Sequence, residues 1–82
     1  MMATSRLAVL VTSPTRVLFQ GAAEILILPG EEGTFEVLPF HRPLVSRLLA
    51  GAVMIDGRAI PIRRGVLRVA DDVVTAIVEP QE

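Results

Sequence analysis

The sequence contains no cysteine, lysine, tryptophan or tyrosine, and it has a single histidine. Without cysteine there is no disulfide framework and no thiolate chemistry, which fits a reducing cytosol. One histidine without cysteine does not build a tetrahedral zinc site, and the acidic segments lack the spaced oxygen ligands of a calcium loop. We therefore expect neither a metal site nor a cofactor.

Long apolar runs are also missing. The longest stretch without a charge is Leu7–Thr15, nine residues, whereas a membrane-spanning helix needs about 20 largely apolar residues. The apolar run that follows Arg6 ends at Val11, which is too short for the core of a secretory signal peptide. We therefore expect no direct membrane insertion.

Excess charge of either sign is absent, since eight arginines stand against nine acidic residues. The chain thus has no basic field to attract nucleic acid. Gly30–Gly33 matches the spacing of a phosphate-clamping Gly-x-x-Gly loop, but its middle residues, Glu31 and Glu32, would repel phosphate. With only three phenylalanines for base stacking, we expect no nucleic-acid partner.

No group of residues indicates catalysis. His41 lies close in sequence to Ser46, but a nucleophile also needs a third group that orients its base, and none is marked. The adjacent carboxylates Glu31/Glu32 and Asp71/Asp72 stand in predicted turns, where neighbouring side chains usually point to water. We expect no catalytic residues.

Hydrophobic residues are abundant: they make up 51% of the chain, and there are six glycines besides. The mean hydropathy is +0.56. A chain of 82 residues has room for one domain, and a domain this small buries only about 60% of the surface that its unfolded form exposes. With a membrane excluded, the surplus apolar surface should face a partner or another copy of the chain.

Hydrophobic residues mostly alternate with period two, which predicts an all-β sandwich or barrel of eight or nine short strands. The expected strands are Arg6–Thr12, Arg16–Gln20, Ala23–Leu28, Thr34–Leu38, Ala52–Ile55, Arg58–Arg63, Gly65–Ala70 and Asp72–Glu79. The second and third of these are expected to separate at Gly21.

Three features refine this prediction. Asp56-Gly57 is a strong signal for a tight hairpin turn. Pro61 should place its strand at a sheet edge, because proline has no N–H for a ladder. Leu44–Leu49 is ambiguous: its i,i+4 pairs Leu44/Leu48 and Val45/Leu49, with Gly51 as a cap, fit a short helix, and a strand or irregular run fits equally well.

The segment Leu28–Leu49 collects the histidine, three prolines and two phenylalanines in a region rich in turns. Loops that carry such groups on a rigid scaffold are common contact sites. We expect Phe35, within a strand, to fill the core. Phe40, between two prolines and beside His41 and Arg42, is the better interface candidate.

This segment also carries a resemblance. The run from Leu28 to Leu44, L-P-G-E-E-G-T-F-E-V-L-P-F-H-R-P-L, resembles the N-terminal β-sandwich domain of the epsilon subunit of F-type ATP synthases. The typical run of that family looks like L-P-G-E-E-G-x-F-G-V-L-P-G-H-A-P-L. The resemblance extends over about residues 5–79 and implies one small two-sheet sandwich of about eight to ten short strands over residues 1–82.

The sequence departs from this family pattern at several places. Phe40 replaces the usual glycine before the histidine, Arg42 replaces an alanine, and Glu36 stands where glycine is common. Family members usually continue into a helical hairpin, and we expect no such C-terminal helical domain within these 82 residues. Because Phe40 and Arg42 lie in the expected contact segment, these departures suggest a partner subunit that diverges from the usual one of the family.

The resemblance implies a non-catalytic bacterial rotor subunit of the central stalk, which links the gamma subunit to the c ring and couples ion transport to ATP synthesis. It implies a peripheral location at the cytoplasmic face of the inner membrane. It assigns Glu31, Glu32 and Thr34 to the c ring, and Ser13, Phe40, His41, Arg42 and Ser46 to gamma. The alternative is a free-standing β-sandwich or barrel that binds a protein or a small ligand. Because of its apolar surplus, the isolated chain is expected to self-associate.

Overall fold

The computed structural model describes residues 6–81, and within them the chain forms eight β-strands and no helix. The strands are β1 (Leu7–Thr12), β2 (Val17–Ala23), β3 (Leu26–Gly30), β4 (Gly33–Val37), β5 (Leu44–Leu48), β6 (Gly51–Ile55), β7 (Arg58–Ala70) and β8 (Val73–Pro80). The prediction of an all-β fold is confirmed. No helix suited to crossing a membrane occurs in this described range.

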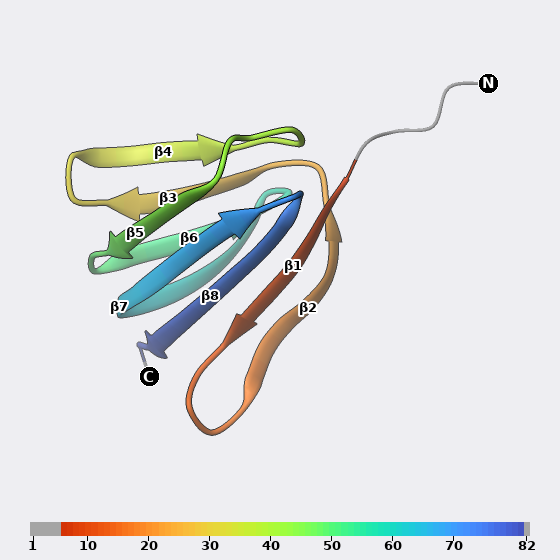
Figure 1. Ribbon diagram of the computed structural model, residues 1–82. Coiled ribbons are helices and arrows are strands. Elements are labelled where there is room, and N and C mark those ends of the chain that lie inside the picture. The colour runs from red at the N-terminus through yellow and green to blue at the C-terminus, as the bar shows by residue number, and fades with distance from the viewer. Residues whose placement is uncertain (1–5, 82) are drawn as a thin grey trace.

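The strands form one continuous hydrogen-bonded sheet in the order β2-β1-β8-β7-β5-β3-β4, with β6 pairing both β3 and β7. The pairs are antiparallel apart from β1 and β8, which run parallel. This sheet folds back on itself at β7. As a result β2, β1, β8 and β5 form one layer, β4, β3 and β6 form the other, and β7 contributes to both (Figure 1). The predicted two-sheet sandwich is confirmed.

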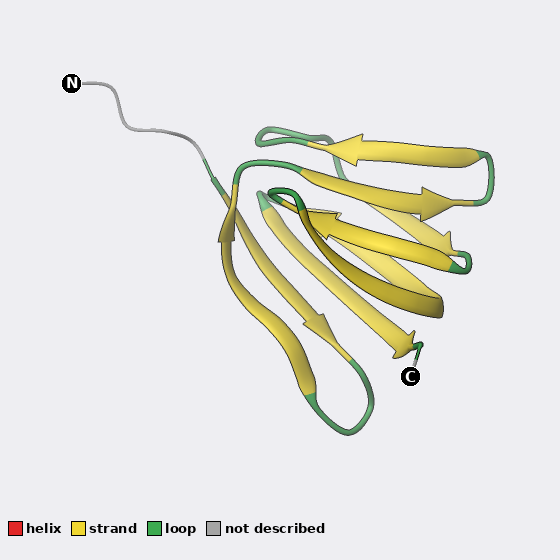
Figure 2. Cartoon of the chain, turned by 180° about the vertical axis from the view of Figure 1, so that it is seen from behind, coloured by secondary structure: helices red, strands yellow, loops and turns green. Residues whose placement is uncertain are grey.

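The long strand β7 belongs to both layers because it bends in its middle (Figure 2). Its ladder with β8 slips between Ile62 and Arg64, which leaves Arg63 as an extra residue. A bulge of this kind bends its strand and shifts the side-chain alternation by one residue. Accordingly Ile62 is buried before the bulge, and Leu67 and Val69 are buried after it.

Gly65 allows the bent strand to approach β8 closely. A Cβ atom at this position would lie 2.8 Å from the carbonyl oxygen of Ile77 and 2.8 Å from Cγ1 of Val78. The sequence predicted one strand ending at Arg63 and another beginning at Gly65; the bend occurs there, but pairing with β8 continues through it.

Pro61 does not make β7 an edge strand, so this prediction is wrong for the strand as a whole. Pro61 is paired with Ala52 of β6, and the ladder to β8 begins one residue later, at Ile62. Beyond that ladder the Pro61 carbonyl accepts the N–H of Gln81 at 3.1 Å. The missing proline N–H therefore falls just outside the β8 ladder.

The turn at Asp56-Gly57 forms as predicted, with φ angles of 48° and 84° at its two residues. The Asp56 carboxylate also accepts the backbone N–H groups of Glu24 and Ile25, at 3.0 Å each through Oδ1. These bonds fix the break between β2 and β3 at residues 24–25. The predicted break at Gly21 is wrong, because β2 continues past Gly21 in register with Val9.

Within the ambiguous segment Leu44–Leu49, residues Leu44–Leu48 form strand β5, which pairs with the second half of β7 from Leu44↔Val69 to Leu48↔Gly65. The segment is a strand because β7 provides a pairing partner, which local periodicity does not specify.

The core lies between the two layers, and its buried members are all aliphatic. These are Leu7, Val9, Val11, Ala23, Leu26, Leu28, Val37, Leu48, Val53, Ile55, Ile62, Leu67, Val69, Val74, Ala76 and Val78. Phe35 packs against this core, as expected.

Candidate functional site

The connections between strands gather at two opposite ends of the sandwich (Figure 1). One end, called the loop end below, comprises residues 24–25, 38–43, 56–57 and 71–72. The other, called the acidic end, comprises residues 13–16, 30–33 and 49–50. The strand β4 runs from Gly33 at the acidic end to Val37, just before the loop end.

Residues 38–43 form the longest connection of the loop end, and backbone hydrogen bonds hold it in place. The Phe40 N–H donates to Oδ1 of Asp72 at 2.6 Å, and the His41 N–H donates to the Leu38 carbonyl at 3.1 Å. Phe40 has a positive φ of 68°, in a region that residues with a side chain seldom adopt. Its side chain is 80% exposed, and that of Leu38 is 49% exposed.

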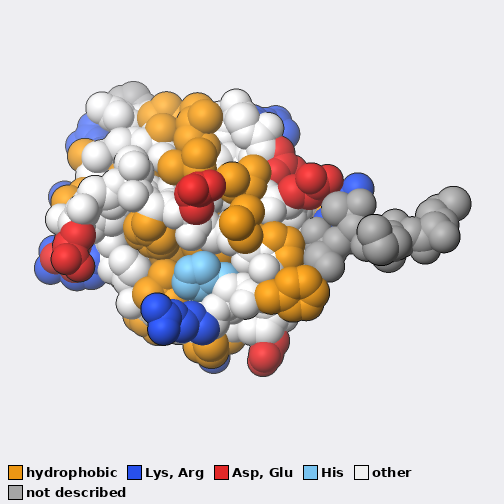
Figure 3. Space-filling view, turned by 90° about the horizontal axis from the view of Figure 1, so that it is seen from above, with side chains coloured by type: hydrophobic (Ala, Val, Ile, Leu, Met, Phe, Trp, Pro, Cys, Tyr) orange, Lys and Arg blue, Asp and Glu red, His pale blue; other side chains and the backbone are white. Residues whose placement is uncertain are grey.

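His41 is engaged within its own loop. Its Nδ1 lies 2.7 Å from the carbonyl oxygen of Arg42, and its side chain is half-buried, whereas Arg42 is exposed. Figure 3 shows hydrophobic surface on both sides of the histidine and an arginine next to it. The same connection thus presents an exposed aliphatic, an exposed aromatic and an exposed cationic side chain, those of Leu38, Phe40 and Arg42.

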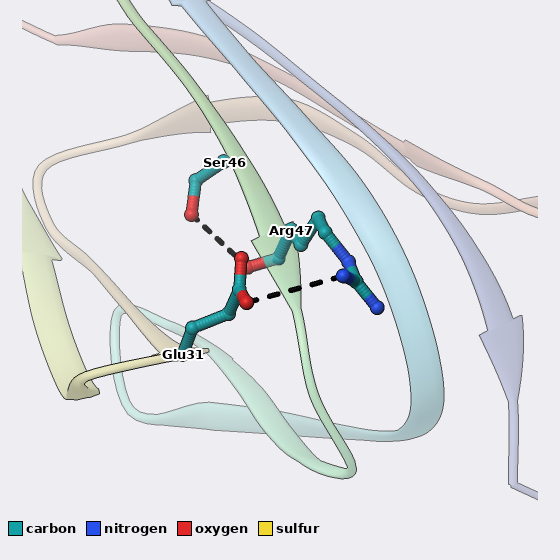
Figure 4. Close-up of polar contacts among 3 residues, drawn as sticks. All are labelled: Glu31, Ser46 and Arg47. Carbon is teal, nitrogen blue, oxygen red and sulfur yellow. Dashed lines mark hydrogen bonds and ion pairs between the residues drawn. The ribbon is translucent and has the colours of Figure 1, made fainter.

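The acidic end presents Glu31, Glu32 and Thr34, all exposed. Oε2 of Glu31 lies 3.9 Å from Nη1 of Arg47, in a pair whose side chains are 55% and 73% exposed (Figure 4). The Ser46 hydroxyl donates to the Arg47 carbonyl at 3.0 Å. A hollow of about 310 Å³ lies here, lined by Gly30, Glu31, Glu32, Gly33, Thr34, Phe35, Leu44 and Ser46. This surface can exchange polar contacts at little cost, because exposed ion pairs are weak.

The structure brings together the three residues predicted to face the c ring, since Glu31, Glu32 and Thr34 all line this hollow. It divides the five residues predicted to face gamma. Phe40, His41 and Arg42 lie at the loop end, Ser13 lies in the β1–β2 turn at the acidic end, and Ser46 borders the acidic hollow.

Ser13 is 7% exposed, and its hydroxyl is used within its own turn. Its Oγ accepts the N–H groups of Thr15 and Arg16, at 3.2 and 3.1 Å. This pattern stabilises the turn in place of a backbone bond. Ser13 therefore shapes the acidic end and presents little surface of its own.

The structure also shows an apolar surface whose residues were not predicted from the sequence. We call it the outer face: the solvent side of the layer that contains β5, β7, β8, β1 and β2. Paired across its strands are Arg47↔Val66, Val66↔Ile77, Ile77↔Thr12 and Thr12↔Val17. Its large exposed apolar side chains are Val17, Val45, Val66, Val73 and Ile77, each between 51% and 72% exposed.

The signal for the outer face was present in the sequence. Both alternating sets of residues in several strands are apolar, which indicates that both faces of these strands are covered. The described chain covers only the inner face. Five of the eight large exposed apolar side chains of the described residues thus lie on one side of the sandwich.

Comparison with known proteins gives a consistent result. Residues 6–82 match the family described as ATP synthase, Delta/Epsilon chain, beta-sandwich domain. The chain is 35% identical over 78 residues to the ATP synthase epsilon chain of Leptospira borgpetersenii (strain JB197), covering 90% of this chain and 61% of the relative. It is 39% identical over 75 residues to that of Janthinobacterium sp. (strain Marseille), covering 84% and 54%.

Two solved structures share the fold. A chain of the Tetrahymena thermophila mitochondrial ATP synthase, in a cryo-EM structure of its central stalk and c ring, has a TM-score of 0.77 at 10% identity, covering 95% of this chain and 66% of that one. A chain of the Euglena gracilis enzyme has a TM-score of 0.79 at 20% identity, covering 100% and 54%. The chain spans 61% and 54% of the length of the two curated relatives described above.

Proposed function

This chain belongs to the delta/epsilon family of ATP synthase chains, to which it corresponds as the β-sandwich domain, and from this we propose that it is a non-catalytic subunit of the central stalk. In this role it links the gamma subunit to the c ring, turns with both, and helps to couple ion transport to ATP synthesis. The observation that carries the proposal is the family match over residues 6–82. The shared fold with a chain of a central stalk and c-ring assembly supports it.

The two opposite ends of the sandwich suit a bridging role. Strand β4 runs between the two ends, and its residues Gly33–Val37 span about 13 Å at about 3.3 Å per residue. Two partners can therefore contact opposite ends without competing for surface. A hydrogen-bonded sandwich between them resists shear, so that rotation of one partner is passed on to the other.

In this proposal the loop end faces gamma through Phe40, His41 and Arg42. Aromatic and arginine side chains are enriched at protein interfaces, and all three residues lie in one connection of the loop end. Ser13 in the β1–β2 turn and Ser46 beside the acidic hollow lie outside the loop end, so in this proposal they take no part in the gamma contact.

The acidic end faces the c ring through Glu31, Glu32 and Thr34. Their exposed carboxylates and hydroxyl suit polar loops at the membrane surface, and the weak Glu31–Arg47 pair leaves both charges able to take other partners. The chain then lies peripherally at the cytoplasmic face of the membrane, held by protein contacts.

The outer face explains the expected behaviour of the isolated chain. A contiguous apolar surface on a soluble domain marks an interaction site or causes aggregation. In the assembled stalk a neighbouring subunit covers this face. Without that neighbour, the chain covers it with another copy of itself.

The proposal is tested by co-expressing the 82-residue chain with a tagged gamma subunit from the same genome. The chain should be recovered with gamma in equal molar amounts after affinity and size-exclusion chromatography. An unrelated β-sandwich of similar size serves as the control for non-specific capture. A free-standing binding module would elute alone, and that result would overturn the proposal.

A further inference from the structure

Phe40 combines two features that folding alone does not explain. Its backbone has a φ of 68°, a conformation in which glycine is favoured and a bulky side chain is strained. Its ring is 80% exposed. The other two phenylalanines behave differently, since Phe19 and Phe35 are partly buried and pack against the core.

Hydrogen bonds hold the backbone of the loop in place at Phe40. The Phe40 N–H donates to the Asp72 carboxylate at 2.6 Å, and Asp72 stands in the tight β7–β8 turn with a φ of 60°. Within the loop, the His41 N–H donates to the Leu38 carbonyl oxygen. A loop whose backbone is already ordered before binding loses less conformational entropy on association.

The neighbours of Phe40 have the chemistry of an interface centre. Leu38 adds exposed aliphatic surface, and Arg42 adds an exposed cation that has no salt bridge to a carboxylate within residues 6–81. The residues that contribute most to binding energy at interfaces are typically Trp, Tyr and Arg at the centre of a desolvated patch. The exposed Phe40 ring and the exposed Arg42 guanidinium, two residues apart in one loop, are similar to these in size and chemistry.

We propose that Phe40 is the anchor by which this chain recognises its gamma subunit: the ring enters an apolar socket on gamma, beside a carboxylate that pairs with Arg42. This inference rests on the proposed function and names the specificity-determining residue of the loop end. Gamma is favoured over the c ring because the polar residues that suit the c ring lie at the acidic end. A lipid surface is disfavoured, because exposed Asp71 and Glu24 lie at the loop end and an anionic bilayer repels them.

The decisive variant is Phe40→Gly, because it should move stability and affinity in opposite directions. Glycine relieves the backbone strain at φ 68°, so the thermal midpoint should equal or exceed that of the parent chain. Loss of the ring should raise the Kd for immobilised gamma by about 30-fold or more, the size expected for an interface anchor. Arg42→Ala should raise the Kd several-fold.

Leu49→Ala is the matched control, because Leu49 is an exposed apolar residue, at 41%, that lies at the acidic end. This variant should leave the Kd for gamma unchanged. If Phe40→Gly binds gamma as tightly as the parent chain does, the anchor is refuted while the proposed function stands. If the parent chain itself does not bind gamma, both fail.

Sedimentation with phosphatidylglycerol vesicles tests whether the Phe40 ring binds a lipid surface instead of gamma. The parent chain and Phe40→Gly should both stay in the supernatant when such vesicles are sedimented. Sedimentation of the parent chain that Phe40→Gly abolishes would overturn the proposal in favour of a lipid contact.

Discussion

Replacing Gly65 with alanine should destabilise the sandwich markedly, because the bend of β7 depends on close approach at this residue. The new Cβ would lie 2.8 Å from the Ile77 carbonyl oxygen and 2.8 Å from Cγ1 of Val78. Gly65 is not among the residues with positive φ, so the whole effect comes from these contacts. Overpacking of this kind typically costs 1–3 kcal/mol.

The upper part of that range applies here, because β8 has little freedom to move away. Gly65 is directly paired with Val78, and the ladder continues on both sides of this pair. We expect a loss of about 2–3 kcal/mol in the free energy of unfolding. For a domain of this size, that lowers the Tm by roughly 10–20 °C.

Gly21→Ala provides the matched control in another strand. A Cβ at Gly21 would meet only Phe19 ring carbons, the nearest at 3.5 Å, an ordinary contact distance. Because glycine within a strand is about 0.5–1 kcal/mol worse than alanine, this variant should be neutral or slightly stabilising. Circular dichroism melts and urea titrations of both variants measure the difference. If the two variants unfold within about 0.5 kcal/mol of each other, the close approach does not determine the bend.

Three further predictions follow from the two ends and the outer face. Asp56→Ala should lower the free energy of unfolding in urea by about 1–3 kcal/mol, since the N–H groups of Glu24 and Ile25 lose a charged acceptor. Asp56→Asn should lose less, and equal losses would contradict this reason. Ile77→Arg on the outer face should change stability by less than about 0.5 kcal/mol but reduce self-association in sedimentation velocity; unchanged association would exclude the outer face as its cause. The double variant Glu31→Gln, Glu32→Gln should weaken retention by membranes that contain the c ring and leave gamma binding intact, whereas a loss of both would indicate general misfolding.

Local chemistry was sufficient to predict much of the fold. Asp56-Gly57 forms its turn because both residues accept positive φ, which is a property of the two residues alone. Period-two alternation predicted the strands at residues 6–12 and 72–79, which form β1 and β8, for a similarly local reason.

The features that sequence reasoning missed depend on distant residues. The β2–β3 break lies at residues 24–25 and not at Gly21, because Asp56, more than thirty residues later, captures the N–H groups there. The segment Leu44–Leu49 forms a strand because β7 offers a pairing partner. Local periodicity contains neither fact.

The candidate site shows the same division. Glu31, Glu32 and Thr34 lie together because the first two form the β3–β4 turn and Thr34 is the second residue of β4. The residues predicted to face gamma came from different parts of the sandwich. Phe40 lies in the connection between β4 and β5, whereas Ser46 lies within β5 beside the acidic hollow, and sequence proximity does not reveal this separation.

The bridging role is the central claim, and site-specific crosslinking in assembled ATP synthase tests it most directly. Because the chain has no cysteine, Glu32→Cys and Arg42→Cys each introduce a unique attachment point for a short photoactivated crosslinker. Our account predicts that Glu32→Cys crosslinks to the c subunit and Arg42→Cys to gamma, each without the other product. Crosslinking of both positions to the same subunit, or of neither position to the complex, would contradict it.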